Sequence, residues 1–173
     1  DYNSVIKALL KEKRFDRAEF WMDQMTKEWC QPSKYSFDLL IHAYAGRQDE
    51  EKVGYWLQKM LHSEIRPDAY TKTHIIYMYG RSGRFDEAEK LMQELKNEGE
   101  ANDFAYNTLV KLYADHQMTK SAYTLVTQMR QAGINIWEGT YMSFLVAVAL
   151  YGKDGDTHSS QSDKRGGKGG GGA

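Results

Sequence analysis

The residue types that most often carry catalysis or bind metals are present in this sequence but are scattered. The five histidines have no partners at the spacing of metal ligands: His42, His62, His74, His116 and His158. A zinc deaminase needs a His-x-Glu and a later Cys-x-x-Cys, which a single cysteine cannot supply. That cysteine, Cys30, has no histidine nearby in sequence, so we expect an ordinary thiol rather than a nucleophile. We therefore predict a protein that is not an enzyme and that has no metal ion or cofactor.

A different chemistry is indicated by polar, cationic and aromatic side chains that recur at intervals of three and four residues, the spacing that places residues on one helix face. The four sets are Asn3, Lys7 and Lys11; Tyr35, Asp38, His42 and Gly46; Tyr70, Thr73, Tyr77 and Arg81; and Phe104, Asn107, Lys111 and Asp115. Short polar groups suit base edges, cations suit phosphates, and rings offer faces on which bases stack. The stripe predicts a surface for a single nucleic-acid strand. The alternative is a solvated helix face whose rings pack between neighbouring helices.

The elements that must position this stripe repeat along the chain. Two position classes keep steps of 35, 35 and 34 residues, namely Trp21, Trp56, Leu91 and Leu125, and Met25, Met60, Leu95 and Met129. We expect helices over residues 2–13, 15–28, 35–46, 49–62, 69–81, 84–98, 103–116, 119–132 and 138–151. A pair of amphipathic helices cannot bury its own apolar face, so the pairs must stack. We predict an all-α, right-handed α-solenoid of about four helix-turn-helix repeats plus a terminal helix.

The composition limits the class of protein but indicates no particular partner. Its 173 residues are 41% hydrophobic and 27% charged, and 23 Lys and Arg against 24 Asp and Glu give no basic field. The longest uncharged apolar stretch, residues 141–151, is far shorter than the ~20 residues that span a bilayer, so we expect no membrane contact. Residues 1–151 are predicted to form the repeat array, and residues 152–173, which are rich in glycine and almost free of apolar side chains, a disordered tail.

The repeat motifs resemble those of the pentatricopeptide repeat family. Tyr106-Asn107-Thr108-Leu109 resembles the start of that family's first helix, Arg81-Ser82-Gly83-Arg84-Phe85-Asp86-Glu87-Ala88 its turn between helices, and Ile65-Arg66-Pro67-Asp68 the end of a unit. The resemblance covers residues 1–151. It implies single-stranded RNA binding in the RNA metabolism of a chloroplast or mitochondrion, such as splicing, processing or stabilisation, with one base per repeat. Because the chain begins inside a repeat without Met, we expect a fragment whose transit peptide, if present, is not visible.

The resemblance also implies roles for individual residues. The fifth and last residues of each unit would read a base: Asn3 with Ser33, Asp38 with Asp68, Thr73 with Asn102 or Asp103, and Asn107 with Trp137. The second residues would pack beside bases: Tyr35, Tyr70 and Phe104. Cationic positions further along the face would contact phosphates: Lys7, Lys11, His42, Arg81 and Lys111. The loop before Phe104 is one residue short, which leaves Asn102 and Asp103 as alternatives.

By the same similarity, Asn at the fifth position favours pyrimidines and Thr favours purines. We therefore expect a weak preference for pyrimidine, any base, purine and pyrimidine, from 5′ to 3′ along the chain. The pair Asp38 and Asp68 should read poorly because it places two acceptors near a polyanion. Trp137 is expected either to stack on a base or to cap the array.

The last predicted helix differs from the others because it is apolar on every side. Such a helix expects cover on both sides, so we predict a homodimer or a partner-protein contact at Phe144, Val146 and Leu150. The alternative is a truncated array with an exposed apolar end. A second function is also open: a non-enzymatic scaffold that holds proteins together in a ribonucleoprotein complex such as an organelle ribosome. The net charge of −2 that we count for the repeat region favours this scaffold.

Overall fold

The computed structural model describes residues 1–28 and 30–152. Within these ranges the chain forms nine helices and no strand: α1 (Tyr2–Lys11), α2 (Phe15–Lys27), α3 (Lys34–Gly46), α4 (Glu50–His62), α5 (Ala69–Arg81), α6 (Phe85–Asn97), α7 (Asp103–Asp115), α8 (Thr119–Gln131) and α9 (Glu138–Tyr151). Apart from Gly152, which caps α9, the predicted tail lies outside the described residues. None of the described helices is long and apolar enough to cross a membrane.

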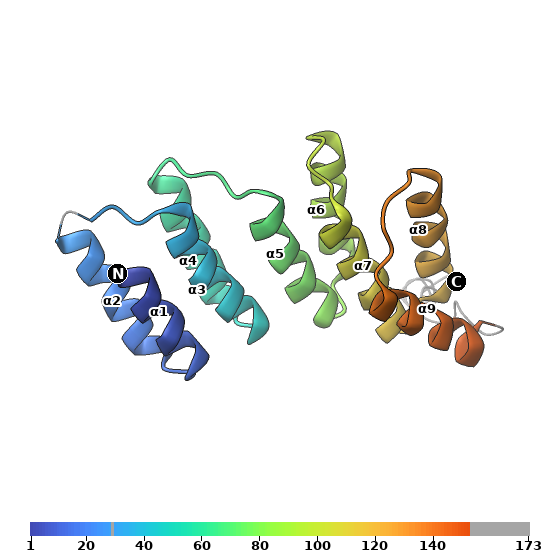
Figure 1. The fold of residues 1–173 in the computed structure, drawn as a ribbon, viewed down its shortest axis with the longest axis horizontal. Coiled ribbons are helices and arrows are strands. Elements are labelled where there is room, and N and C mark those ends of the chain that lie inside the picture. The colour runs from blue at the N-terminus through green and yellow to red at the C-terminus, as the bar shows by residue number, and fades with distance from the viewer. Residues whose placement is uncertain (29, 153–173) are drawn as a thin grey trace, which may run out of the picture.

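The helices form hairpins that stand side by side along the long axis of the molecule (Figure 1). The first helices of successive pairs, α1, α3, α5, α7 and α9, pack on one another in a continuous row. Each second helix packs on the first helix of its own pair, as α2 does on α1 and α8 does on α7. The predicted solenoid of four pairs and a terminal helix is thereby confirmed.

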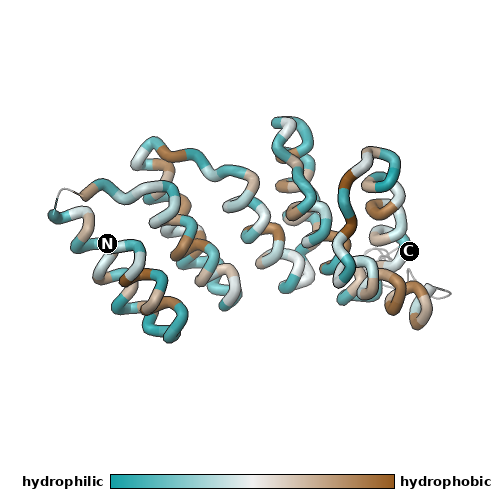
Figure 2. Tube along the Cα trace, in the orientation of Figure 1, coloured by the Kyte–Doolittle hydropathy of each residue, from teal (hydrophilic) through white to brown (hydrophobic). Residues whose placement is uncertain are grey.

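The buried side chains are those of the sequence repeat. Trp56, Met60, Leu95 and Met129 are fully or almost fully buried, and the small residues Ala18, Ala88 and Ala122 lie at the same depth in their own units. Apolar segments accordingly recur along the inner sides of the hairpins (Figure 2). The first helices approach closely at Gly80 of α5, where a Cβ atom would lie 2.5 Å from Cδ1 of Leu112 in α7. The array is therefore held by contacts between neighbouring units.

Helix ends were predicted to within one or two residues, and the largest difference has a clear cause. Helix α1 ends at Lys11 instead of residue 13, because Lys13 turns the chain with a φ of 60°. Gln48, Gly83 and Gln117 turn the other three hairpins with φ values of 63°, 74° and 62°. Glycine is the residue that favours this left-handed conformation, and among these four turns only that of Gly83 has one. The sequence therefore predicts the end of the helix at Gly83 but not at Lys13.

Candidate nucleic-acid interface

The first turns of the first helices place aromatic rings in a row along one edge of the solenoid. Tyr35, Tyr70 and Phe104 lie in α3, α5 and α7, and Trp137 precedes α9. The ring centroids of Tyr70 and Phe104 are 6.0 Å apart at an interplanar angle of 28°, and those of Phe104 and Trp137 are 6.1 Å apart at 21°. The side chains of Tyr35, Tyr70 and Trp137 are about half exposed. We call these four residues the aromatic row.

A hollow of about 510 Å³ adjoins the aromatic row between α3, α5 and α7. It brings together four of the residues that the sequence assigned to nucleic acid, His42, Arg81, Phe104 and Lys111. Arg81 donates to the hydroxyl of Tyr77 at 3.0 Å, so its guanidinium is held at the edge of the hollow. The exposed cations Lys7, Lys11, Arg81 and Lys111 form no ion pair with the described part of the chain, which leaves their charges available to phosphates.

Two stacked histidines form one wall of the hollow. The rings of His42 and His74 lie 4.0 Å apart at 26°, and His74 also contacts Tyr70 and Phe104 edge to face. Nε2 of His74 is buried without a hydrogen-bond partner. Burial, and secondarily the neighbouring His42, lowers the pKa of His74 to about 4, while burial lowers the pKa of His42 below 6.5. At neutral pH both rings are therefore uncharged, and His42 can offer a phosphate a hydrogen bond but no full charge.

The fifth-position side chains are less open than expected. The hydroxyl of Thr73 is buried and donates to the carbonyl oxygen of Ala69 at 2.6 Å. The side chain of Asn107 is buried as well: Nδ2 donates to the carbonyl oxygens of Asp103 and Asn135, and Oδ1 accepts from the N–H of Trp137, all at 2.8 Å. The expectation that these groups face an open channel is not met. Their reading of bases stays a prediction, and it now requires that backbone hydrogen bonds be exchanged.

Asn3 lacks the hydrogen bond that Asn107 accepts from the N–H of Trp137. The N–H that corresponds to that of Trp137 belongs to Ser33, and it donates to Oγ of Ser36 at 3.1 Å. Oδ1 of Asn3 is therefore buried without a partner. A buried acceptor without a donor costs free energy, which a donor on a ligand would recover. Among the fifth residues that the structure describes, Asn3 keeps an unused acceptor.

The last residues of the units act as helix caps. Side chains of Ser33, Asp68 and Asn102 accept from the N–H three residues later, at 3.4, 3.1 and 3.1 Å. Such caps typically contribute about 1 kcal/mol. Asp103 is instead the first residue of α7, so Asn102 is the structural equivalent of Ser33 and Asp68. Trp137 holds the same place before α9 without a side-chain cap.

In the second unit the two predicted reading carboxylates are already occupied. Nζ of Lys34 lies 2.5 Å from Oδ2 of Asp38 and 2.8 Å from Oδ2 of Asp68. The hydroxyl of Thr71 lies 2.6 Å from Oδ1 of Asp38 and so holds the other carboxylate oxygen. Sequence reasoning missed Lys34, although its position four residues before Asp38 on one helix was visible and favours an ion pair.

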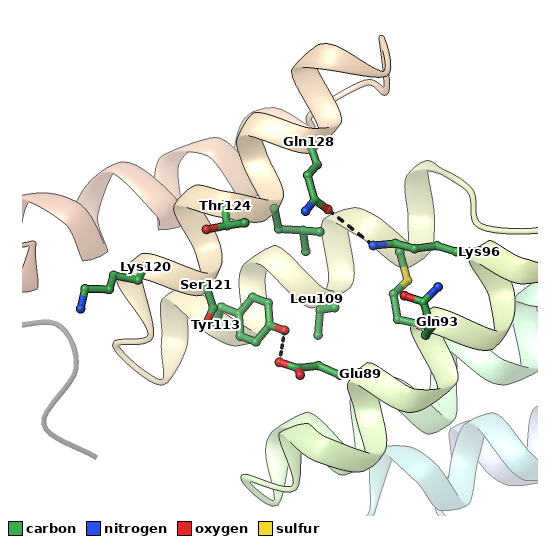
Figure 3. Close-up of a pocket in the computed structure, with 11 residues that line it drawn as sticks. Glu89, Gln93, Lys96, Leu109, Tyr113, Lys120, Ser121, Thr124 and Gln128 are labelled. Atoms are coloured by element: carbon green, nitrogen blue, oxygen red, sulfur yellow. Dashed lines mark hydrogen bonds between the residues drawn. The ribbon is translucent and has the colours of Figure 1, made fainter. Parts of the chain in front are cut away.

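A second hollow, of about 360 Å³, lies between α6 and α8 and contains none of the predicted residues (Figure 3). Two polar pairs line it: Tyr113 donates to Glu89 at 2.5 Å, and Lys96 donates to Gln128 at 3.5 Å (Figure 3). The same tyrosine–glutamate contact joins Tyr44 to Glu19 in the first two units. Because the tyrosine–glutamate contact recurs at two places in the array, we interpret it as structural.

The terminal helix requires one correction. Phe144 was predicted to face a partner, but it is only 6% exposed and packs beside Tyr123 and Tyr141. Phe144 belongs to the core because α9 covers α7 and α8 with that face. Val146 and Leu150 are 51% and 65% exposed, so α9 has an uncovered apolar face, which does not include Phe144. A dimer or partner contact there stays a prediction.

Comparison with known proteins decides the family. A model described as the PPR repeat family matches residues 2–46, and the PPR repeat model matches residues 70–100 and 104–134, together more than half of the chain. The chain belongs to the pentatricopeptide repeat family. A chloroplastic pentatricopeptide repeat-containing protein of Arabidopsis thaliana is 32% identical over 88% of this chain and 17% of its own length. A mitochondrial one from the same plant is 27% identical over 70% of this chain and 20% of its own length.

Solved pentatricopeptide structures share the fold. The maize protein PPR10, in complex with an 18-nucleotide psaJ RNA element, superposes with a TM-score of 0.75 at 22% identity, over 86% of this chain and 22% of that one. The PPR domain of Arabidopsis protein-only RNase P 1, in complex with tRNA, gives a TM-score of 0.67 at 13% identity, over 87% and 80%. At these identities the likeness establishes the solenoid alone. This pentatricopeptide chain spans about a fifth of the length of the curated relatives above.

Proposed function

We propose that this chain binds single-stranded RNA along its row of first helices, in the RNA metabolism of a chloroplast or mitochondrion. The observation that carries the proposal is the aromatic row, in which the rings of Tyr70, Phe104 and Trp137 are nearly parallel and spaced at 6.0 and 6.1 Å beside a hollow edged by Arg81 and Lys111. Rings that follow a cationic groove are the arrangement that single strands need. Family membership and the organelle names of the relatives support the same function.

The spacing of the rings supports one base per repeat. A base sandwiched between two rings needs about 6.8 Å, twice the ~3.4 Å stacking distance of nucleic acids. The observed gaps are shorter by less than 1 Å, so a small opening of the row admits one base between successive units. The reading pairs are then Asn3 with Ser33, Thr73 with Asn102, and Asn107 with Trp137. To read a base, Thr73 and Asn107 must give up hydrogen bonds to the backbone for hydrogen bonds to the base. Stacking should therefore contribute more affinity than base reading.

The scaffold function is the second candidate, and the hydrogen bonds of Asn107 favour it. An amide that satisfies three backbone groups has a sufficient structural role without RNA. In this case the row of first helices would contact protein or structured RNA without base preference. Binding to randomised short RNA strands distinguishes the two functions, because only reading enriches particular bases at particular nucleotides.

We predict that Phe104→Ala lowers RNA affinity about tenfold, because Phe104 is the central ring of the row and one base-stacking contact is worth ~1–3 kcal/mol. The measurement is fluorescence anisotropy with a labelled single strand at fixed salt. Tyr123→Ala is the matched control, since Tyr123 is 63% exposed on α8 and lies outside the row. Equal affinities of the two variants would contradict the proposed binding face.

We predict that Thr73→Asn changes the preference at the third nucleotide from purine to pyrimidine. Position 73 is buried, but Asn107 occupies the equivalent site of the next unit, so the fold accommodates asparagine there. The change should be at least about fivefold, since one mismatched base costs ~1–3 kcal/mol. Sequencing of bound strands from a randomised pool measures it, and an unchanged profile counts against base reading at this position.

A further inference from the structure

The second unit holds a cation where the three units after it hold none. The first residues of the four later first helices are Lys34, Ala69, Asp103 and Glu138, so a positive side chain occurs at this place only in α3 among the described units. Nζ of Lys34 reaches across to both carboxylates of its own unit, Asp38 and Asp68. These are the fifth and last residues, the pair that would face a base.

The ammonium covers the carboxylate of Asp38 and lies beside that of Asp68. The side chain of Asp38 is 6% exposed and that of Lys34 39%, so Lys34 lies outside Asp38, whereas the side chain of Asp68 is 44% exposed. Nζ lies 6.0 Å from the centroid of the Tyr70 ring, one of the half-exposed rings of the aromatic row. The ammonium therefore lies next to the aromatic row, at the place where a base bound by the second unit would enter.

The contact keeps Lys34 and Asp68 charged. Burial would lower the pKa of Lys34, but its hydrogen bonds to Asp38 and Asp68 outweigh burial and raise it. Burial would likewise raise the pKa of Asp68, but hydrogen bonds from Lys34 and Thr71 lower it. Both partners are thus ionised at neutral pH. With Thr71 on the other oxygen, both carboxylate oxygens of Asp38 already accept a hydrogen bond.

We propose that Lys34 is an internal ligand that closes the second unit to base reading, so that the bound strand is read on either side of one unread nucleotide. The inference rests on the proposed RNA binding and adds a specificity-determining residue to it. A lysine ammonium is a compact charge on a flexible stem, so the donor that it keeps discriminates poorly between base edges. Stacking on the aromatic row remains available to the unread base.

Removing the ammonium frees two acceptors, Oδ2 of Asp38 and Oδ2 of Asp68, which both lie next to the position that Nζ occupied. Guanine presents two adjacent donors, N1–H and N2–H₂, on the edge that would enter, whereas cytosine and adenine present one amino group there. Lys34→Met keeps most of the aliphatic stem. Two unneutralised carboxylates near a polyanion should weaken binding overall, but among the strands that bind we expect this variant to enrich guanine about tenfold at the second nucleotide, which the wild type leaves unselected.

Lys34→Met leaves two carboxylates without their cation, and their repulsion could unfold the protein. A second pair of variants therefore neutralises Asp38. Asp38→Asn alone leaves Asp68 holding the ammonium, so the second nucleotide should remain unselected. Lys34→Met combined with Asp38→Asn leaves an open Asn–Asp pair, which by family resemblance favours a pyrimidine. Lys52→Met is the matched control, because Lys52 also bridges a carboxylate, Glu19, at 2.7 and 2.9 Å, but lies on α4.

All variants are compared by sequencing the strands that each retains from one randomised pool. The second nucleotide is the one immediately 5′ of the nucleotide whose preference responds to Thr73→Asn. A profile that is the same for Asp38→Asn and for the double variant overturns the role of Lys34, as does clear selection at this nucleotide by the wild type. If the role of Lys34 is overturned but Thr73→Asn still changes the base profile, the proposed RNA binding stands without the inference about Lys34. If no protein selects a base anywhere, both fail.

Discussion

Replacing Asn107 with alanine is expected to lower the free energy of unfolding by about 3 kcal/mol, because a buried polar group left without its partner typically costs ~1–3 kcal/mol. Of the three backbone groups that Asn107 bonds, the carbonyl oxygen of Asp103 still accepts from the N–H of residue 107 within α7, which leaves two without a partner: the carbonyl oxygen of Asn135 and the N–H of Trp137. The last two lie 28 and 30 residues away in the chain, in the segment that leads into α9. The loss should therefore loosen α9 from α7 as well as destabilise α7.

Denaturation by urea, followed by circular dichroism, measures the change. Asn97→Ala is the control, because Asn97 is an exposed asparagine near the end of α6 that only accepts from Gln93 at 2.9 Å. Its effect should stay within about 0.5 kcal/mol. Asn107→Asp tests the donors separately, since aspartate keeps the acceptor for Trp137 but turns a negative oxygen toward two carbonyl oxygens. Equal stabilities of Asn107→Ala and Asn97→Ala would show that the three bonds carry no net free energy.

Asn107 also shows where sequence reasoning succeeds and where it ends. Helix positions and the buried stripe follow from periodicity, because burial of one face is a property of each helix and its own residues. The fate of a fifth-position side chain depends instead on which backbone groups the next unit brings within 3 Å of it. Asn3 and Asn107 have the same residue type and the same place in the repeat, yet only Asn107 finds a donor for its Oδ1.

The same limit applies to the other unpredicted features. Asn102 was separable from Asp103 only once capping showed which residue precedes the helix. Phe144 was assigned to an open face because a helix that is apolar all round gives no sign of which side is covered. Lys34 was overlooked because its second partner, Asp68, is 34 positions away in the sequence and adjacent only after the units stack. Each unit thus shares one backbone pattern but presents a different polar arrangement to the groove.

The buried histidine of the groove gives the second large effect, which concerns acid. In the folded chain His74 has a pKa of about 4, against about 6.5 for an unburied histidine, so the folded state resists protonation that the unfolded state accepts. The contribution to stability is therefore present above pH 6.5 and is lost as the pH falls toward 4. Groups that face the ring include His42 stacked on it, with Arg81, Lys111 and Asp115 lining the same hollow. A proton on His74 has no acceptor at its buried Nε2.

We expect the wild type to lose about 2 kcal/mol more stability between pH 7 and pH 5 than His74→Leu, as a depressed histidine pKa of this size requires. Leucine is chosen because Leu39 occupies the equivalent position of α3. His62→Leu is the control: His62 is exposed in the last turn of α4, and its removal should leave the wild-type acid sensitivity in place. Urea denaturation at the two pH values measures both differences. Parallel losses in the wild type and in His74→Leu would mean that His74 is protonated as readily in the folded as in the unfolded chain, and that the stacked histidines do not keep the groove uncharged in mild acid.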